Sequence, residues 1–168
     1  MLLYLYGLAA AGKNYVGEVL QESFGFTFYD GDLDLTDELR EAVRTQQPFT
    51  DAMRDRFYAV VLRRIGELQA GIPFLAFGQA TFKERHRQQI LATYPEVVFV
   101  WVTADFSLRM ARLQDGLNPV TADYAQRIDA FFEPPGHPTY IIDNSGTRAD
   151  VAAQCLALLS ELAHTGRC

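Results

Sequence analysis

The sequence predicts a three-layer α/β/α domain built on a five-stranded parallel sheet. Strand-like apolar runs alternate with stretches of helical periodicity along the 168 residues, which is the order typical of a parallel sheet covered by helices on both faces. The first run, residues 2–6, is apolar or aromatic throughout and stops at Gly7, as a buried parallel strand entering a tight turn does. A chain of this length can bury about 70% of its surface in one core, so we expect a single domain.

The segment after this first strand has the glycine spacing of a phosphate-binding P-loop. Gly7 and Gly12 precede Lys13, and because glycine tolerates positive φ the loop can close with several N–H groups facing an anion. The next helix adds the positive end of its dipole, and the lysine reaches the outer phosphates. The residues expected to bind the nucleotide phosphates are Gly7, Leu8, Ala9, Ala10, Ala11, Gly12, Lys13 and Asn14.

The last position of the motif departs from the usual pattern. A P-loop normally continues with Ser or Thr, whose hydroxyl binds Mg²⁺, whereas this chain has Asn14. An amide oxygen can also ligate a hard cation, although less habitually than a hydroxyl in this motif. We therefore expect Asn14 to take part in binding Mg²⁺.

The elements after the loop follow in a regular order. Apolar residues at helical spacing predict a helix over residues 15–23, which ends before a glycine. The β-prone run 26–29 predicts the second strand. A short helix is expected over residues 37–43, and a longer one begins within residues 48–51, where Thr50 is a suitable N-cap.

The second half of the chain repeats this alternation. A Gly-Ile-Pro turn leads into a third strand, residues 74–77, which ends at Gly78 and is followed by a basic helix over residues 82–92. The fourth strand, residues 97–102, has the clearest pattern, and its helix is expected over residues 105–114.

The last third of the chain holds a turn-prone stretch and the closing elements. Residues 115–119 read Asp-Gly-Leu-Asn-Pro and have space for a short, mobile lid. A helix over residues 121–132, a fifth strand over residues 140–142 and a closing helix over residues 149–163 complete the domain. The chain has no internal repeat and no low-complexity segment.

Charge and cysteine content restrict the class of partner. With 21 acidic and 15 basic residues the net charge is −6, which argues against nucleic acid or an anionic membrane as partner. No run reaches the ~20 apolar residues of a membrane span, and the opening segment is too short for a signal peptide. Two cysteines without a framework or metal spacing indicate a reducing compartment. We expect a cytoplasmic monomer or homodimer that acts on a small molecule.

Several further segments, taken in order, resemble a known group of enzymes. The chain has Asp-Gly-Asp at 30–32, Pro-Phe-Thr-Asp-Ala-Met-Arg at 48–54, an Asp-Phe to Arg-Leu helix at 105–113 and Phe-Phe-Glu-Pro at 131–134. Together with the P-loop they are similar to the small P-loop kinases that include gluconokinase and shikimate kinase, most closely to gluconokinase. The resemblance implies a P-loop NTPase fold with a short lid, ATP and Mg²⁺ as cofactors, and phosphoryl transfer to a hydroxyl of a small sugar acid or related metabolite.

Departures from the gluconokinase pattern leave the acceptor open. Gluconokinases have His-Pro where this chain has Leu35 and Thr36, and a basic lid segment where this chain has Gly116. Two alternatives therefore remain: a kinase of a nucleotide or coenzyme precursor, and a nucleotide-binding protein with weak catalysis.

The resemblance assigns roles near the reacting groups. Lys13 would cover the transferring phosphoryl group, Asp32 would orient the acceptor hydroxyl and accept its proton, and Asp30 would bind Mg²⁺ together with Asn14. Acids placed after a parallel strand lie at the carboxyl edge of the sheet, where ligands bind. The competing reading is a solvated Asp-Gly turn.

Arginines around the cleft complete the predicted site. Arg54 would hold a substrate carboxylate, and Gly78 and Arg87 are further candidates for acceptor binding. In the group that the chain resembles, one arginine before the lid packs on adenine and one after it contacts the transferring phosphate. The resemblance therefore implies these roles for Arg112 and Arg127. Arginines on helix surfaces are more often simply solvated, which is the competing interpretation for each.

Overall fold

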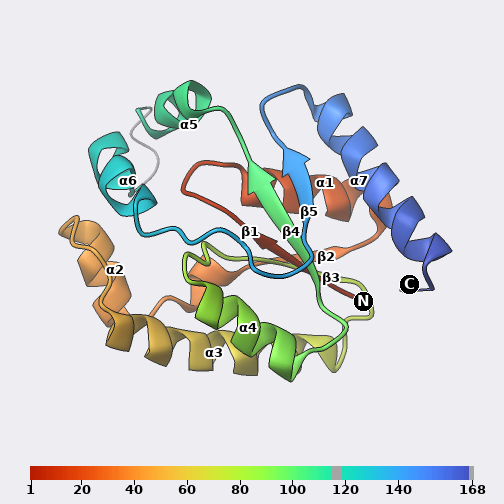
Figure 1. Ribbon diagram of the computed structural model, residues 1–168, viewed down its shortest axis with the longest axis horizontal. Coiled ribbons are helices and arrows are strands. Elements are labelled where there is room, and N and C mark those ends of the chain that lie inside the picture. The colour runs from red at the N-terminus through yellow and green to blue at the C-terminus, as the bar shows by residue number, and fades with distance from the viewer. Residues whose placement is uncertain (115–118, 167–168) are drawn as a thin grey trace.

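The computed structural model describes residues 1–114 and 119–166, in which a parallel sheet lies between two layers of helices (Figure 1). The strands are β1 (Leu2–Tyr6), β2 (Thr27–Asp30), β3 (Leu75–Gly78), β4 (Val98–Thr103) and β5 (Tyr140–Asp143). The helices are α1 (Lys13–Phe24), α2 (Asp37–Arg44), α3 (Asp51–Gln69), α4 (Glu84–Thr93), α5 (Phe106–Leu113), α6 (Ala122–Asp129) and α7 (Arg148–His164), with a short 3₁₀ turn η1 (Gly31–Asp34).

Strand β1 occupies the centre of the sheet. The strand order is β2-β3-β1-β4-β5, and all four pairings are parallel. Every residue of β1 is buried, because its two neighbours cover its edges and helices cover its faces. The chain leaves β1 between β3 and β4, where strand order reverses, which is where open α/β sheets bind ligands.

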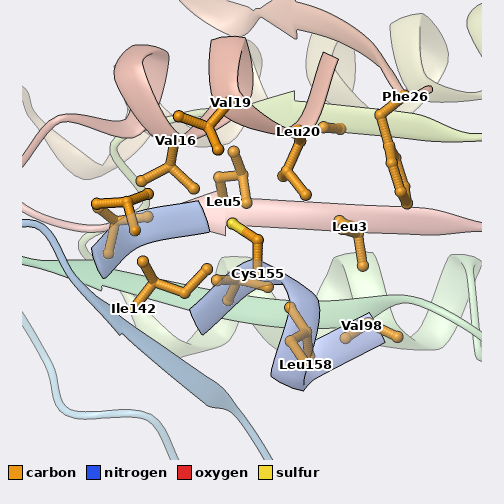
Figure 2. Packing of buried hydrophobic residues seen from close by; sticks show 14 of the residues in the cluster. Leu3, Leu5, Val16, Val19, Leu20, Phe26, Val98, Ile142, Cys155 and Leu158 are labelled. Atoms are coloured by element: carbon orange, nitrogen blue, oxygen red, sulfur yellow. The ribbon is translucent and has the colours of Figure 1, made fainter. Parts of the chain in front are cut away.

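One face of the sheet is covered by α1 and α7 (Figure 1). Leu3 and Leu5 of β1 point into this layer and pack with Val16 and Leu20 of α1 and with Cys155 of α7, as Figure 2 shows. Burial raises the pKa of the Cys155 thiol to about 11, so this cysteine is an inert part of the core.

The opposite face is covered by α3 and α4. Alternation along β1 sends Tyr4 and Tyr6 to this side, where Tyr4 stacks on Phe77 with ring centroids 5.7 Å apart. Phe57 and Ile65 of α3 are buried in the same cluster. The predicted three-layer architecture and parallel sheet are therefore confirmed.

The helices α5 and α6 form a smaller unit beside the loop that follows β1. Met110, Leu113 and Ala125 make a separate buried cluster, against which Ala9 and Ala10 of the loop pack. Residues 115–118 of the predicted lid lie outside the described residues. No helix within residues 1–114 or 119–166 is both long and apolar enough to cross a membrane.

Most element boundaries lie within two residues of the prediction, and two differences are larger. The helix expected over residues 121–132 ends at Asp129, because the chain turns toward two prolines that cannot continue a helix. The turn η1 was not predicted; it forms because the Asp30 side chain accepts a hydrogen bond from the Asp32 N–H and caps it. The N-cap role expected for Thr50 is confirmed, since its hydroxyl accepts from the Met53 N–H.

The packing of α1 predicts a large difference between two leucines. Leu20→Ala should lower the free energy of unfolding by about 2–5 kcal/mol, because it opens a cavity in a closed core, whereas Leu156→Ala on α7, where the side chain is 57% exposed, should change it by less than about 0.5 kcal/mol. Urea unfolding followed by circular dichroism measures both. Equal losses would contradict the core described above.

Candidate active site

The loop after β1 is shaped by two glycines that admit no side chain. Gly7 has φ 153° and Gly12 has φ 95°. A Cβ added to Gly7 would lie 2.2 Å from the Val102 carbonyl oxygen, and one added to Gly12 would lie 1.9 Å from Nδ2 of Asn144. The backbone therefore passes close to the end of β4 and to Asn144, which follows β5, along a path open only to glycine. It delivers Gly12 to the start of α1, whose dipole favours an anion.

Two arginines of α5 hold the carbonyl groups of this loop. Arg109 donates from Nε to the Ala9 carbonyl at 2.9 Å and from Nη2 to Asp129 of α6 at 2.9 Å. Arg112 donates to the carbonyls of Ala10 at 3.1 Å and Asn144 at 2.9 Å. Arg112, the predicted adenine contact, thus lies against the outer side of the loop.

Lys13 lies over the mouth of the loop. Its Nζ donates to the carbonyls of Gly7 at 3.4 Å and Leu8 at 3.2 Å. Burial lowers the pKa of Lys13, and the nearby carboxylates of Asp32 and Asp30 oppose that shift. The ammonium group is positioned where an anion bound by the loop amides would meet it.

Asn14 and Asp30, the two predicted metal ligands, are brought together. Asn14 Nδ2 donates to Asp30 Oδ2 at 2.6 Å, and Asp30 Oδ1 accepts from the Asp32 N–H at 2.9 Å. The contact uses the amide nitrogen of Asn14. A hard cation at this place would take the carboxylate and the amide oxygen as ligands and its other ligands from phosphate and water. Within the described part of the chain, no three His, Cys, Asp or Glu residues converge to form a complete metal cage.

A cavity of about 310 Å³ opens beside the loop and the two acids. Its polar side chains come from the loop, η1, α3 and the end of β3: Lys13, Asn14, Asp32, Arg54, Tyr58 and Gln79, with Tyr124 from α6. Apolar residues form most of the remaining wall: Leu35, Val43, Phe49, Phe57, Phe82, Val120 and Ile128. The phosphate-binding loop therefore borders a mostly apolar cavity with a few polar groups, which is typical of a small-molecule site.

Asp32 lines this cavity together with Lys13. Burial raises the pKa of Asp32, while the Lys13 ammonium and the Gln79 side chain lower it in part. A carboxylate with a raised pKa is a stronger base and can accept a proton from a bound hydroxyl.

Arg54 reaches the cavity from α3. The residue is 9% exposed, its Nη1 donates to the Phe49 carbonyl, and its guanidinium lies 5.8 Å from the centroid of the Phe49 ring. This anchoring leaves the side chain fixed in the wall with other N–H groups available. The structure thus brings Lys13, Asp32 and Arg54 around one cavity.

Arg87 does not have the predicted acceptor-binding position. It is fully buried, and its nitrogens donate to Glu84 at 2.7 Å, to the Thr81 carbonyl at 2.7 Å and to the Glu133 carbonyl at 2.6 Å. The guanidinium also lies 5.1 Å from the Tyr6 ring centroid. Because α4 packs this side chain against the sheet, Arg87 ties the segment after β3 to residues 133–134 and does not line the cavity.

Arg127 and Gly78 also lie outside the cavity wall. Arg127, the predicted contact of a transferring phosphate, is exposed, donates to the Gln46 carbonyl at 3.3 Å and lies over the Tyr124 ring. Gly78 ends β3, and a Cβ there would lie 3.0 Å from Phe28. Its role is close packing, and the next residue, Gln79, faces the cavity.

Hydrogen bonds join the segment after α2 to the start of α6 at the rim of the cavity, and the two helices are neighbours in Figure 1. Thr121 Oγ1 donates to Gln46 Oε1 at 2.7 Å, and the Tyr124 hydroxyl donates to the Gln47 carbonyl at 2.7 Å. Sequence reasoning did not identify this connection or the cavity residue Gln79. The position of Gln79 directly after a strand at the carboxyl edge was the available signal.

The chain is similar in sequence or in structure to several small-molecule kinases. The sequence is 34% identical over 118 residues to a shikimate kinase from Chromobacterium violaceum; the match covers 68% of the chain and spans 61% of that relative's length. The structure is similar to a gluconokinase from Sinorhizobium meliloti, with a TM-score of 0.82 at 22% identity over 97% of this chain and 93% of the other. A sugar kinase from Janibacter also gives a TM-score of 0.82, at 16% identity over 95% of this chain and 94% of that one.

No protein-family model matches the chain. The structural matches nevertheless confirm the predicted fold class, and the named relatives are of the kind that the motifs resemble. The chain has the fold of small P-loop kinases.

The buried cluster around Arg87 predicts a pH effect on stability. Burial opposes ionisation of Glu84, but hydrogen bonds from Gln88, His137 and Arg87 hold its pKa at about 2. Since this pKa is below its unfolded value, Glu84 stabilises the fold above about pH 4.5, and the contribution disappears as the pH falls toward 2. At ~1.4 kcal/mol per pKa unit the effect is roughly 3 kcal/mol.

Urea unfolding of Glu84→Gln between pH 7 and about pH 2 tests this. The variant should lose less stability than the parent protein as the pH falls. Glu96→Gln, at an exposed glutamate, is the matched control and should follow the parent curve. Parallel curves for the parent and Glu84→Gln would contradict the assignment.

Proposed function

We propose that the protein transfers the γ-phosphoryl group of ATP to a hydroxyl of a small acid, in the class of sugar acids or related metabolites. One observation carries the proposal: Lys13 of the phosphate-binding loop and the Asp32 carboxylate face the same cavity, whose wall also holds Arg54. Phosphoryl transfer requires alignment of the two reactants and cationic cover for the phosphoryl oxygens, and these residues are suited to both.

The loop and its surroundings provide the nucleotide site of this proposal. Residues 7–14 would bind the phosphates, with Lys13 directed at the outer ones, and Arg112 would border the adenine end. Asn14 and Asp30 would bind Mg²⁺, which screens the charge of the phosphates when present. A reducing, ATP-rich compartment such as the cytoplasm suits the buried thiol of Cys155.

Asp32 and Arg54 would contact two different groups of the acceptor. The acceptor oxygen attacks the γ-phosphorus of ATP. The bond between that phosphorus and the oxygen that leaves with ADP breaks, and the hydroxyl proton passes to Asp32. The raised pKa of Asp32 assists that transfer, because a weaker acid gives a more basic carboxylate. Arg54 would bind the acid group of the acceptor through its remaining N–H donors, which supports an anionic acceptor.

The two lysines of the chain should differ in their effect on activity. Lys13→Ala should lower the rate of ADP release at least tenfold, or ~1.4 kcal/mol in barrier, without changing the far-UV spectrum. Lys83, which pairs with Glu133 at 2.9 Å away from the loop, provides the matched control, and Lys83→Ala should keep most of the activity. The assay supplies ATP and Mg²⁺ with gluconate, shikimate and nucleoside monophosphates in separate reactions.

Three outcomes are informative in that assay. Activity with an acid supports the proposal. Activity restricted to nucleoside monophosphates rejects it in favour of a nucleotide kinase. Tight ADP binding without turnover of any acceptor indicates a nucleotide-binding protein. A Lys13→Ala variant with more than about a tenth of the parent rate would remove the lysine from the mechanism.

The second prediction concerns the two residues that face the acceptor. Asp32→Asn keeps the shape of the side chain but removes the proton acceptor, so kcat should fall steeply while the acceptor KM changes little. Arg54→Ala removes a contact made in both ground and transition states, so the acceptor KM should rise most. Steady-state kinetics with both substrates varied measure this, and a rise confined to the ATP KM in Arg54→Ala would reverse the proposed orientation of the cleft.

A further inference from the structure

Gln79 is a buried cavity residue whose oxygen has no partner. It is 4% exposed, and its Oε1 accepts no hydrogen bond from any described residue. Its backbone N–H donates to the Leu5 carbonyl at 2.9 Å, which extends the pairing of β3 with β1 and fixes the residue at the carboxyl edge of the sheet. A buried acceptor without a partner destabilises the protein until a donor reaches it, and Gln79 lines the cavity from which a ligand would supply one.

The other half of the Gln79 amide is directed to Asp32. Gln79 and Asp32 line the same cavity, and the Gln79 side chain is a hydrogen-bond partner of the Asp32 carboxyl. The amide nitrogen makes this contact, because it is the only side-chain donor that glutamine has. With the nitrogen assigned to Asp32, the oxygen remains for a different group. Asp32 and Gln79 therefore form a pair of hydrogen-bond acceptors beside each other, one charged and one neutral.

The rest of the cavity offers few polar contacts to an acceptor. The Tyr58 hydroxyl donates to Thr81 Oγ1 at 2.8 Å, and the Tyr124 hydroxyl donates to the Gln47 carbonyl at 2.7 Å, so the protons of both are already used. Phe49, Phe57 and Phe82 form apolar walls. Each additional hydroxyl of an open polyhydroxy chain would lose its water against such a wall without replacement.

We propose that Gln79 determines acceptor specificity: its Oε1 accepts a hydrogen bond from a second hydroxyl, adjacent to the one that Asp32 orients. The acceptor is then a compact acid with two neighbouring hydroxyls and otherwise little polar surface. This inference rests on the proposed function, since it assigns the reacting hydroxyl to Asp32.

Binding of two matched acids tests the inference. The probes are a dihydroxycyclohexanecarboxylate with adjacent hydroxyls and its monohydroxy counterpart, titrated by calorimetry in the presence of ADP, with each stereoisomer measured separately. The parent protein should bind the best dihydroxy isomer about tenfold or more tightly than its counterpart, because a site built for a hydroxyl rejects the analogue that lacks it. Gln79→Met, which keeps volume and removes the amide, should bring that ratio close to one.

The test has a matched control and defined results that would overturn the proposal. Gln89→Met, at an exposed glutamine of α4, should keep the parent ratio. A Gln79→Met variant that weakens both acids equally would show a merely structural role and overturn the proposal, as would a parent protein that binds both acids equally or neither. Turnover of gluconate by a protein that does not bind the ring acids rejects this inference alone, whereas turnover restricted to nucleoside monophosphates rejects the proposed function as well.

Discussion

The close approach of the backbone after β1 to the strands beside it governs the site. Gly7 lies against the Val102 carbonyl and Gly12 lies against Asn144. Because the loop can approach these neighbours so closely, Lys13 and the first turn of α1 face the cavity. This close approach depends in turn on β1, because its complete burial fixes where the strand ends relative to its neighbours. Core packing and phosphate binding are thus linked through a few backbone atoms.

Charge at the site is balanced within a small group of residues. Burial alone would favour the neutral form of Lys13, and the carboxylates of Asp30 and Asp32 counter that tendency. The lysine in turn lowers the pKa of Asp32, which burial raises. Because each group sets the protonation of the other, neither residue can be replaced without altering both the phosphate-binding charge and the proposed proton acceptor.

Strand ends were predictable from the sequence, but the directions of helix side chains were not. Asp30 and Asp32 lie at the end of β2, and Lys13 follows the loop after β1, so topology brings all three to the carboxyl edge of the sheet. Arg87 and Arg127 lie on amphipathic helices whose orientation depends on tertiary packing: α4 turns Arg87 into the core, and α6 turns Arg127 toward Gln46. Gln79 also follows a strand at the carboxyl edge, but that position alone does not show whether an isolated polar side chain faces the cavity.

The cavity has a base and a rim of different construction. Its base rests on the buried clusters of the sheet, whereas α2 and α6 meet at its rim through a few hydrogen bonds from Thr121 and Tyr124 to Gln46 and Gln47. Contacts of this kind open locally at a lower free-energy cost than a packed core does. The cavity wall therefore combines a base that is held by the packed core with a rim that can open locally at a lower free-energy cost.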